Sequence, residues 1–135
     1  MNERRAVNSN SRDTDTTVGQ LRDLVSEFVN DRNWQQFHRP KNLAMSIAIE
    51  AAELMEHFQW VTHQQGDQIT QDALRLVDIR EELADVLSYL LAMANALGID
   101  LTQALTEKMQ KNELKYPKDE FYDRYGPTDS GPPET

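Results

Sequence analysis

The chain reads EAAE at residues 50–53 and ELAD at residues 82–85, two acidic motifs separated by 28 residues. Each motif lies in a stretch with strong helical periodicity, so a spacing of three residues puts both acids of a pair on one helix face. Converging, partly buried carboxylates repel one another unless they are protonated or neutralised. Because Mg²⁺ prefers oxygen ligands, the sequence predicts a magnesium site between two helices. The predicted ligands are Glu50, Glu53, Glu82 and Asp85.

Two alternatives to a magnesium site stay open at this point. An E-x-x-E pair on a helix is often only a solvated face, although Glu50 lies within about 40° of Leu43 on the helical wheel, at the edge of an apolar stripe. A carboxylate-bridged di-iron bundle needs a Glu-x-x-His motif from each of two helices. Here the residue three positions after Glu53 is Glu56. Ligation by oxygen alone, and therefore Mg²⁺ or Mn²⁺, is favoured.

Apolar periodicity and capping residues predict an all-α, four-helix bundle with no strand. The first helix should begin at the capping box Thr17-x-x-Gln20 and end near residue 32, and the second should run from Pro40 to about residue 61. The third should run from about residue 70 to a stop at Gly98, and the fourth from an Asp100 cap to residues 116–117. Residues 62–70 are expected to be a loop. The predicted core stripe of the third helix is Leu76, Ile79, Leu83, Val86, Leu87, Leu90 and Leu97.

Composition limits the classes of protein. With 135 residues the chain is expected to hold one domain, residues 16–125, between disordered tails at residues 1–15 and 126–135. No apolar run has the length of a membrane span or the form of a signal peptide, so we expect a cytoplasmic protein without a membrane partner. Zero cysteines exclude thiol catalysis and cysteine-ligated zinc. A net charge of −9 argues against nucleic-acid binding, while metal ions still permit nucleotide binding.

Several further residues allow either a functional or a structural interpretation. Trp34, His38 and Trp60 fall at predicted helix ends, where such rings either wall a base pocket or close a core. Lys108 and Asn112 lie one turn apart on the fourth helix, where they either bind phosphate or form an ordinary exposed face. Neither a G-x-S-x-G elbow nor a Gly-rich phosphate loop is present in the sequence.

The motif pattern resembles a known family. The chain reads RNWQQFHRPKNL at residues 32–43, FQW at residues 58–60 and EELADVLSYLL at residues 81–91. With Lys108, Asn112 and the Tyr-Pro pair at residues 116–117, these segments resemble the all-α nucleoside triphosphate pyrophosphohydrolases of the MazG-like group, and within it the dCTP pyrophosphatase branch. The resemblance covers roughly residues 18–117.

The resemblance implies hydrolysis of a nucleoside triphosphate between its α and β phosphates, with Glu50 or Glu53 orienting or deprotonating the attacking water. It implies that the four acids hold Mg²⁺, that Lys108 and Asn112 bind phosphates, and that dCTP and 5-modified dCTP are cleaved in nucleotide-pool house-cleaning. It also implies a homodimer or homotetramer in which neighbouring chains complete each site. The residues expected to frame or line the base pocket are Trp34, His38, Asn42, Trp60 and Tyr89.

Three alternatives remain beside this interpretation. The chain departs from the dCTP branch at residues 62–70, at residues 110–115 and in both tails, so a pyrophosphohydrolase for a different non-canonical triphosphate is open. A nucleotide-sensing helical oligomer without hydrolysis would keep the aromatic pocket but not need all four acids. A purely structural oligomer would need neither the acids nor the aromatic cluster.

Overall fold

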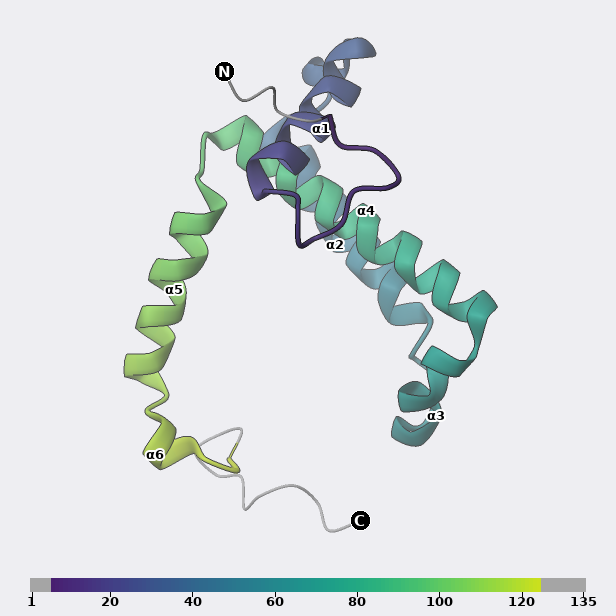
Figure 1. The fold of residues 1–135 in the computed structure, drawn as a ribbon, viewed down its shortest axis with the longest axis vertical. Coiled ribbons are helices and arrows are strands. Elements are labelled where there is room, and N and C mark those ends of the chain that lie inside the picture. The colour runs from purple at the N-terminus through teal and green to yellow at the C-terminus, as the bar shows by residue number, and fades with distance from the viewer. Residues whose placement is uncertain (1–5, 125–135) are drawn as a thin grey trace. The chain divides into compact units, whose positions relative to one another are not determined.

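The computed structural model describes residues 6–124, and every regular element within that range is helical (Figure 1). This confirms the predicted all-α class and the four long helices. The long helices are α1 (Val18–Asp31), α2 (Pro40–Glu56), α4 (Ala73–Leu97) and α5 (Leu101–Lys115). The short elements are η1 (Trp34–Gln36), α3 (His63–Asp67), η2 (Gln68–Gln71) and α6 (Lys118–Phe121).

Local signals set the start of α1 and the end of α4. The Thr17 hydroxyl accepts the N–H of Gln20 at 3.1 Å, and the Gln20 side chain accepts the N–H of Thr17 at 2.8 Å, which is a complete capping box. Gly98 ends α4 with a φ of 64°, in the left-handed region that a residue without a Cβ adopts at low cost. Both boundaries were predicted from the sequence, and both are confirmed.

The predicted boundary between the second and third long helices is wrong. Helix α2 ends at Glu56 instead of continuing to about residue 61, because the chain turns where the Phe58 N–H donates to the Met55 carbonyl at 3.0 Å. The predicted loop at residues 62–70 contains α3 and part of η2. A second capping box, between Thr62 and Gln65, starts α3, and its residue pattern was already visible in the sequence.

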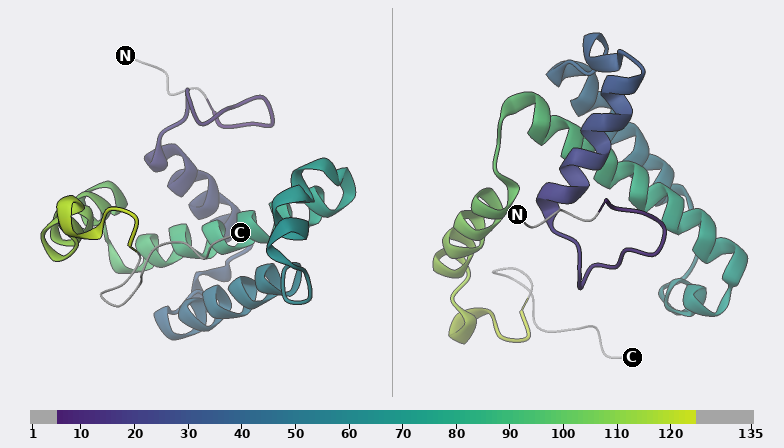
Figure 2. Two further views of the ribbon diagram at one scale, coloured as in Figure 1. Left: turned by 90° about the horizontal axis from the view of Figure 1, so that it is seen from below. Right: turned by 45° about the horizontal axis from the view of Figure 1, so that its top comes forward.

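Helix α4 is the element on which the unit up to Ile99 is built. Helices α1 and α2 both pack against it, as two views of the ribbon show (Figures 1 and 2). The Arg75 guanidinium donates to the His57 carbonyl at 2.7 Å, so the end of α2 lies beside the beginning of α4 and the two helices are antiparallel. At the other end of α4, Asn95 accepts from Arg22 of α1 at 3.0 Å.

The buried core is small and differs from the predicted stripe. The fully buried apolar residues are Val29, Leu43, Ile69, Leu91, Ala92 and Ala94. Five members of the predicted stripe on α4, Leu76, Leu83, Leu87, Leu90 and Leu97, are each at least 40% exposed. The prediction that these five belong to a core is therefore wrong for the single chain. Helix α4 is apolar around much of its circumference, and its packing partners cover only part of it.

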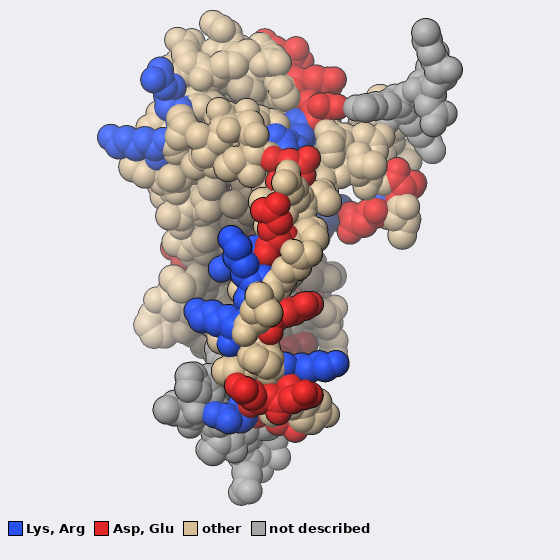
Figure 3. Space-filling model, turned by 90° about the vertical axis from the view of Figure 1, so that its left-hand side faces the viewer, with Lys and Arg blue, Asp and Glu red and all other residues tan. Residues whose placement is uncertain are grey.

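A second compact unit begins at Asp100. The Asp100 carboxylate caps α5 by accepting the Gln103 N–H at 2.8 Å, as predicted. Beyond the end of α5, the rings of Tyr116 and Phe121 meet edge to face at 5.2 Å. Lysine and arginine side chains are interspersed with acidic ones along this unit (Figure 3). The single domain over residues 16–125 stays a prediction.

The segment before α1 contains no helix within its described part, residues 6–16. Turns are closed there by the Ser11 N–H on the Asn8 carbonyl at 2.9 Å and the Asp15 N–H on the Arg12 carbonyl at 3.0 Å. Disorder of residues 1–15 stays a prediction, and the predicted tail at residues 126–135 lies outside the described residues. Across residues 6–124, no single helix is long and apolar enough to cross a membrane. Only α4 and α5, taken together as a bent pair, have the length and composition of a membrane span.

Candidate metal centre and adjoining cavity

Three of the four predicted ligands come together between α2 and α4. Glu50 and Glu53 lie one turn apart on α2, and Glu82 faces them from α4. One carboxylate oxygen from each of the three lies within 4.8 Å of the other two. Asp85 is outside that group of three but lies close enough to raise the pKa of both Glu50 and Glu82. The antiparallel packing of two helices thus converts two motifs 28 residues apart into one acidic centre.

The acids of this centre are poorly neutralised by the protein. Burial raises the pKa of the Glu50 carboxyl, and the charges of Glu53, Asp85 and Glu82 raise it further. Burial also raises the pKa of Glu82, with Glu53 and Asp85 acting in the same direction and His57 acting against them. In addition, the Oε2 atom of Glu82 is buried and has no hydrogen-bond partner among residues 6–124. A group of carboxylate oxygens that repel one another and include an orphaned acceptor fits a hard divalent cation.

These pKa shifts predict how the metal-free protein responds to pH. Because folding raises the pKa of Glu82 above its ordinary value of 4.5, the group favours folding below that pH and opposes it as the pH rises through the raised value. We therefore expect Glu82→Gln, which mimics the protonated acid, to have a higher Tm than the parent protein at pH 7.5 in chelator. The difference should shrink as the pH falls toward 4.5.

Thermal unfolding of both proteins from pH 7.5 to pH 5 checks this expectation. Adding Mg²⁺ at pH 7.5 should reverse the order, because the cation stabilises the parent and the variant has lost a ligand. A Tm difference that does not change with pH would show that folding does not raise the pKa of Glu82.

An aromatic cavity of about 560 Å³ opens beside the acidic centre. Its walls come from α1, from η1 with the residues that follow it, and from α4. The His38 and Tyr89 rings stack with centroids 6.4 Å apart, and Phe28 meets Trp34 edge to face at 5.8 Å. The residues that line it are Leu24, Val25, Phe28, Val29, Trp34, His38, Asp85, Ser88 and Tyr89. Asp85 thus belongs to the wall of this cavity and to the neighbourhood of the carboxylate cluster.

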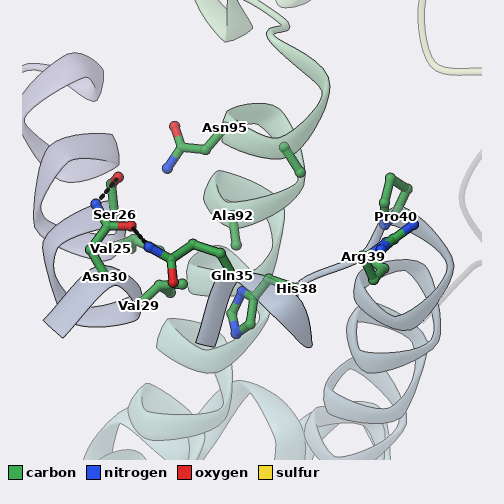
Figure 4. A pocket seen from close by; sticks show the side chains of 11 residues that line it. Val25, Ser26, Val29, Asn30, Gln35, His38, Arg39, Pro40, Ala92 and Asn95 are labelled. Atoms are coloured by element: carbon green, nitrogen blue, oxygen red, sulfur yellow. Dashed lines mark hydrogen bonds between the residues drawn. The ribbon is translucent and has the colours of Figure 1, made fainter. Parts of the chain in front are cut away.

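A second cavity of about 390 Å³ lies between α1, the start of α2 and the last turns of α4, and His38 lines both cavities (Figure 4). Three of its polar side chains, those of Asn30, Gln35 and Asn95, are amides, and each is already engaged in a hydrogen bond. The Gln35 amide donates to the Asn30 side chain, and the Asn95 amide donates to the Arg22 carbonyl at 3.1 Å. None of the described residues that line this cavity carries a carboxylate. The larger, aromatic cavity therefore suits a flat ring beside a metal centre better.

The left-handed backbone of Asn33 helps to direct Trp34 into the aromatic cavity. Its φ of 51° is tolerated by asparagine, and it turns the chain between α1 and η1. Val25 and Phe28 also line the cavity, and neither was among the site residues expected from the sequence. Ser88 was missed as well, although its place one turn after Asp85 on the same helix was a usable signal.

Four residues expected in the site are not among those that line the aromatic cavity. Trp60 is 86% exposed and lines a separate cavity of about 340 Å³ with Arg75 and Gln65. The Asn42 amide instead donates to the Phe37 carbonyl at 3.1 Å. Lys108 and Asn112 lie on α5, in the second unit. The roles of Trp60, Asn42, Lys108 and Asn112 stay predictions.

The chain is similar in sequence to known proteins. A family model described as the MazG-like family matches residues 45–125. The chain is 41% identical over 102 residues to dCTP pyrophosphatase 1 of Rattus norvegicus, a match that covers 75% of this chain and 59% of the relative. It is 39% identical over 101 residues to dCTP pyrophosphatase 1 of Homo sapiens, with the same two shares. The chain thus spans about three-fifths of the length of these relatives.

A solved structure has the same fold. The crystal structure of a pyrophosphatase from Archaeoglobus fulgidus superimposes with a TM-score of 0.69 at 38% sequence identity. The match covers 83% of this chain and 99% of that one. Likeness in fold and sequence therefore extends well beyond the two acidic motifs.

Proposed function

The chain belongs to the MazG-like family, and from this premise we propose that it hydrolyses a nucleoside triphosphate to the monophosphate and pyrophosphate. One observation carries the proposal: Asp85 lies in the wall of an aromatic cavity and also acts electrostatically on the cluster of three glutamates. A base held in the cavity would have its phosphates beside the acids. The name of the matched relatives, dCTP pyrophosphatase 1, supports the same reaction.

Glu50, Glu53, Glu82 and Asp85 are the residues that would hold Mg²⁺, with Mn²⁺ as the alternative ion. When bound, the ion neutralises the triphosphate and the acids and relieves the charge that develops on the phosphate oxygens. Glu50 or Glu53 would orient a water molecule and accept its proton while the water oxygen bonds to the α phosphorus. The bond between the α phosphorus and the bridging oxygen then breaks, and pyrophosphate leaves. Lys108 and Asn112 would bind the phosphates.

For the substrate we propose dCTP and 5-modified dCTP, in house-cleaning of the nucleotide pool in the cytoplasm. The support is the name of the relatives together with the stacked His38 and Tyr89 rings and the adjacent Trp34. Stacking alone does not discriminate between bases, whereas hydrogen bonds to the base edge do. A pyrophosphohydrolase for a different non-canonical triphosphate is therefore the second candidate.

Removing the Trp34 ring should weaken substrate binding more than it slows the chemistry. Stacking of a base on an aromatic side chain contributes about 1–3 kcal/mol, so Trp34→Ala should raise KM for the triphosphate by about five- to a hundredfold. Steady-state kinetics of pyrophosphate release measures the effect. As a control, Phe37→Ala removes an aromatic ring that is 59% exposed and does not line the cavity, and its KM should stay near that of the parent. Equal effects of the two variants would contradict the assignment of the cavity.

We also propose that the protein is a homodimer or homotetramer. The apolar stripe Leu76, Leu83, Leu87, Leu90 and Leu97 runs along the whole of α4, and α2 exposes Met45 at 50% and Ile49 at 57%. Single chains rarely keep such extended apolar faces in contact with water. Trp60, at 86% exposed, would then be available to a neighbouring chain.

Light scattering after size exclusion should give two or four times the chain mass of 15.6 kDa. Leu90→Glu should lower that mass, because it places a charge on the apolar stripe of α4. Leu74→Glu is the matched control: Leu74 is on the same helix and 82% exposed but lies off the stripe, so its variant should keep the parent mass. A parent protein that elutes as a monomer would contradict the proposal.

A panel of canonical and 5-modified triphosphates, each assayed for pyrophosphate release with Mg²⁺, tests the function. The expected result is the highest kcat/KM for dCTP or a 5-modified dCTP. A preference for another base would favour the second candidate. Binding of a triphosphate without any turnover would instead support a nucleotide sensor.

A further inference from the structure

Arg75 connects the two helices that carry the acidic pairs. It is half-buried in the first turn of α4, and its guanidinium donates to the His57 carbonyl, just past the end of α2, at 2.7 Å. Its own N–H donates to the Asp72 carboxylate at 3.1 Å, which fixes the backbone from which the side chain extends. A carbonyl at a helix end has no partner within the helix, and a cation is favoured there. This hydrogen bond therefore joins the end of α2 to the beginning of α4.

The hydrogen bond between Arg75 and the His57 carbonyl lies near Glu53 and Glu82 along both helices. His57, the first residue past the end of α2, lies one turn after Glu53, and Arg75 lies seven residues, or about two turns, before Glu82 on α4. Arg75 and Glu82 consequently fall on the same face of α4. In the metal-free protein the neighbouring Glu53 raises the pKa of Glu82 across the contact between α2 and α4. The hydrogen bond between Arg75 and the His57 carbonyl lies about 10 Å along α4 from Glu82, and it limits how far the end of α2 can slide along α4 or move away from it.

We infer that Arg75 is a positioning residue that holds the end of α2 against α4, so that Glu53 and Glu82 are already spaced to take a divalent cation. This inference rests on the metal site proposed above. If the carboxylates are already held at the right spacing, no free energy is spent on bringing them together when the ion binds. The ion therefore binds more tightly. Nothing in this role requires Arg75 to touch the ion or the substrate.

Whether replacing Arg75 raises or lowers the affinity for the cation distinguishes a positioning role from a purely electrostatic one. Removing a positive charge near a cation site should strengthen cation binding if Coulomb interactions alone were involved. Loss of positioning should weaken it. Substitutions in the outer surroundings of a metal site typically cost ten- to a hundredfold in metal affinity, so we expect about a tenfold loss for Arg75→Met.

The test is binding of Mn²⁺ alone to the full chain, followed by the paramagnetic resonance signal of free Mn²⁺ at a temperature where circular dichroism shows each variant folded. Arg75→Met keeps a long apolar side chain and removes the donor. Arg75→Lys keeps the charge and one donor, and it should lose less affinity than Arg75→Met. If the methionine variant does not fold, the lysine variant carries the test, and affinity below that of the parent is the supporting result.

Arg22→Met is the matched control. Arg22 likewise donates to helix-end groups, the Asn95 side chain at 3.0 Å and the Ile99 carbonyl at 2.5 Å, but at the opposite end of α4 from Arg75. The Arg22→Met variant should have a lower Tm than the parent but the same affinity for Mn²⁺. The inference is overturned if Arg75→Met binds Mn²⁺ as tightly as the parent, or if Arg22→Met weakens binding to the same extent. A parent protein that binds no Mn²⁺ removes the proposed metal site and this inference with it.

Discussion

Glu53→Gln should lower the rate of pyrophosphate release from dCTP by about three orders of magnitude, which corresponds to about 4 kcal/mol of lost transition-state stabilisation. Among the neighbouring charges, that of Glu53 raises the pKa of both Glu50 and Glu82 the most. The amide keeps the size of the side chain but removes its charge and half of its oxygen ligands. Both the metal affinity and the orientation of the attacking water should therefore suffer.

The control for this variant is Glu56→Gln. Glu56 lies on the same helix and is exposed, and its substitution makes the same change in net charge. Its kcat/KM should stay within about threefold of the parent, as expected for a surface change away from the site. Equal losses in the two variants, or a Glu53→Gln protein that keeps a tenth of the parent rate, would remove Glu53 from the reaction.

Removing divalent cations should abolish turnover altogether. Without a cation, the triphosphate must approach several carboxylates of the same sign, and nothing relieves the charge that develops in the transition state. Turnover should vanish in excess chelator and return when Mg²⁺ or Mn²⁺ is added. Thermal unfolding supplies an independent readout, since a cation present at a hundred times its Kd stabilises the folded state by about 2.7 kcal/mol. Undiminished turnover in chelator would contradict the assignment of the acidic centre.

Signals that act within a few residues allowed much of the fold to be predicted. The Thr17 capping box, the Gly98 stop and the Asp100 cap all depend on neighbouring backbone groups, and each was placed correctly. The convergence of the acidic pairs was also predictable, because Glu50 borders the stripe that contains the buried Leu43.

Features that depend on contacts between distant segments were harder to predict from the sequence. The end of α2 at Glu56 coincides with a contact from Arg75, 18 residues beyond His57, which no local pattern reveals. The aromatic cavity needs α1 to lie against α4, so Val25 and Phe28 could not be told from core residues by periodicity. The stripe on α4 was mistaken for a core because an exposed apolar helix face and a face packed inside the chain have the same apolar periodicity.

The most direct test of the central claim is ³¹P nuclear magnetic resonance of dCTP incubated with the parent protein and Mg²⁺. The claim is that the carboxylates between α2 and α4 direct water to the α phosphorus of a nucleotide held in the adjoining cavity. It predicts two phosphorus-containing products, dCMP and pyrophosphate. The appearance of dCDP and inorganic phosphate, or an unchanged dCTP spectrum in the presence of folded protein and Mg²⁺, would contradict it.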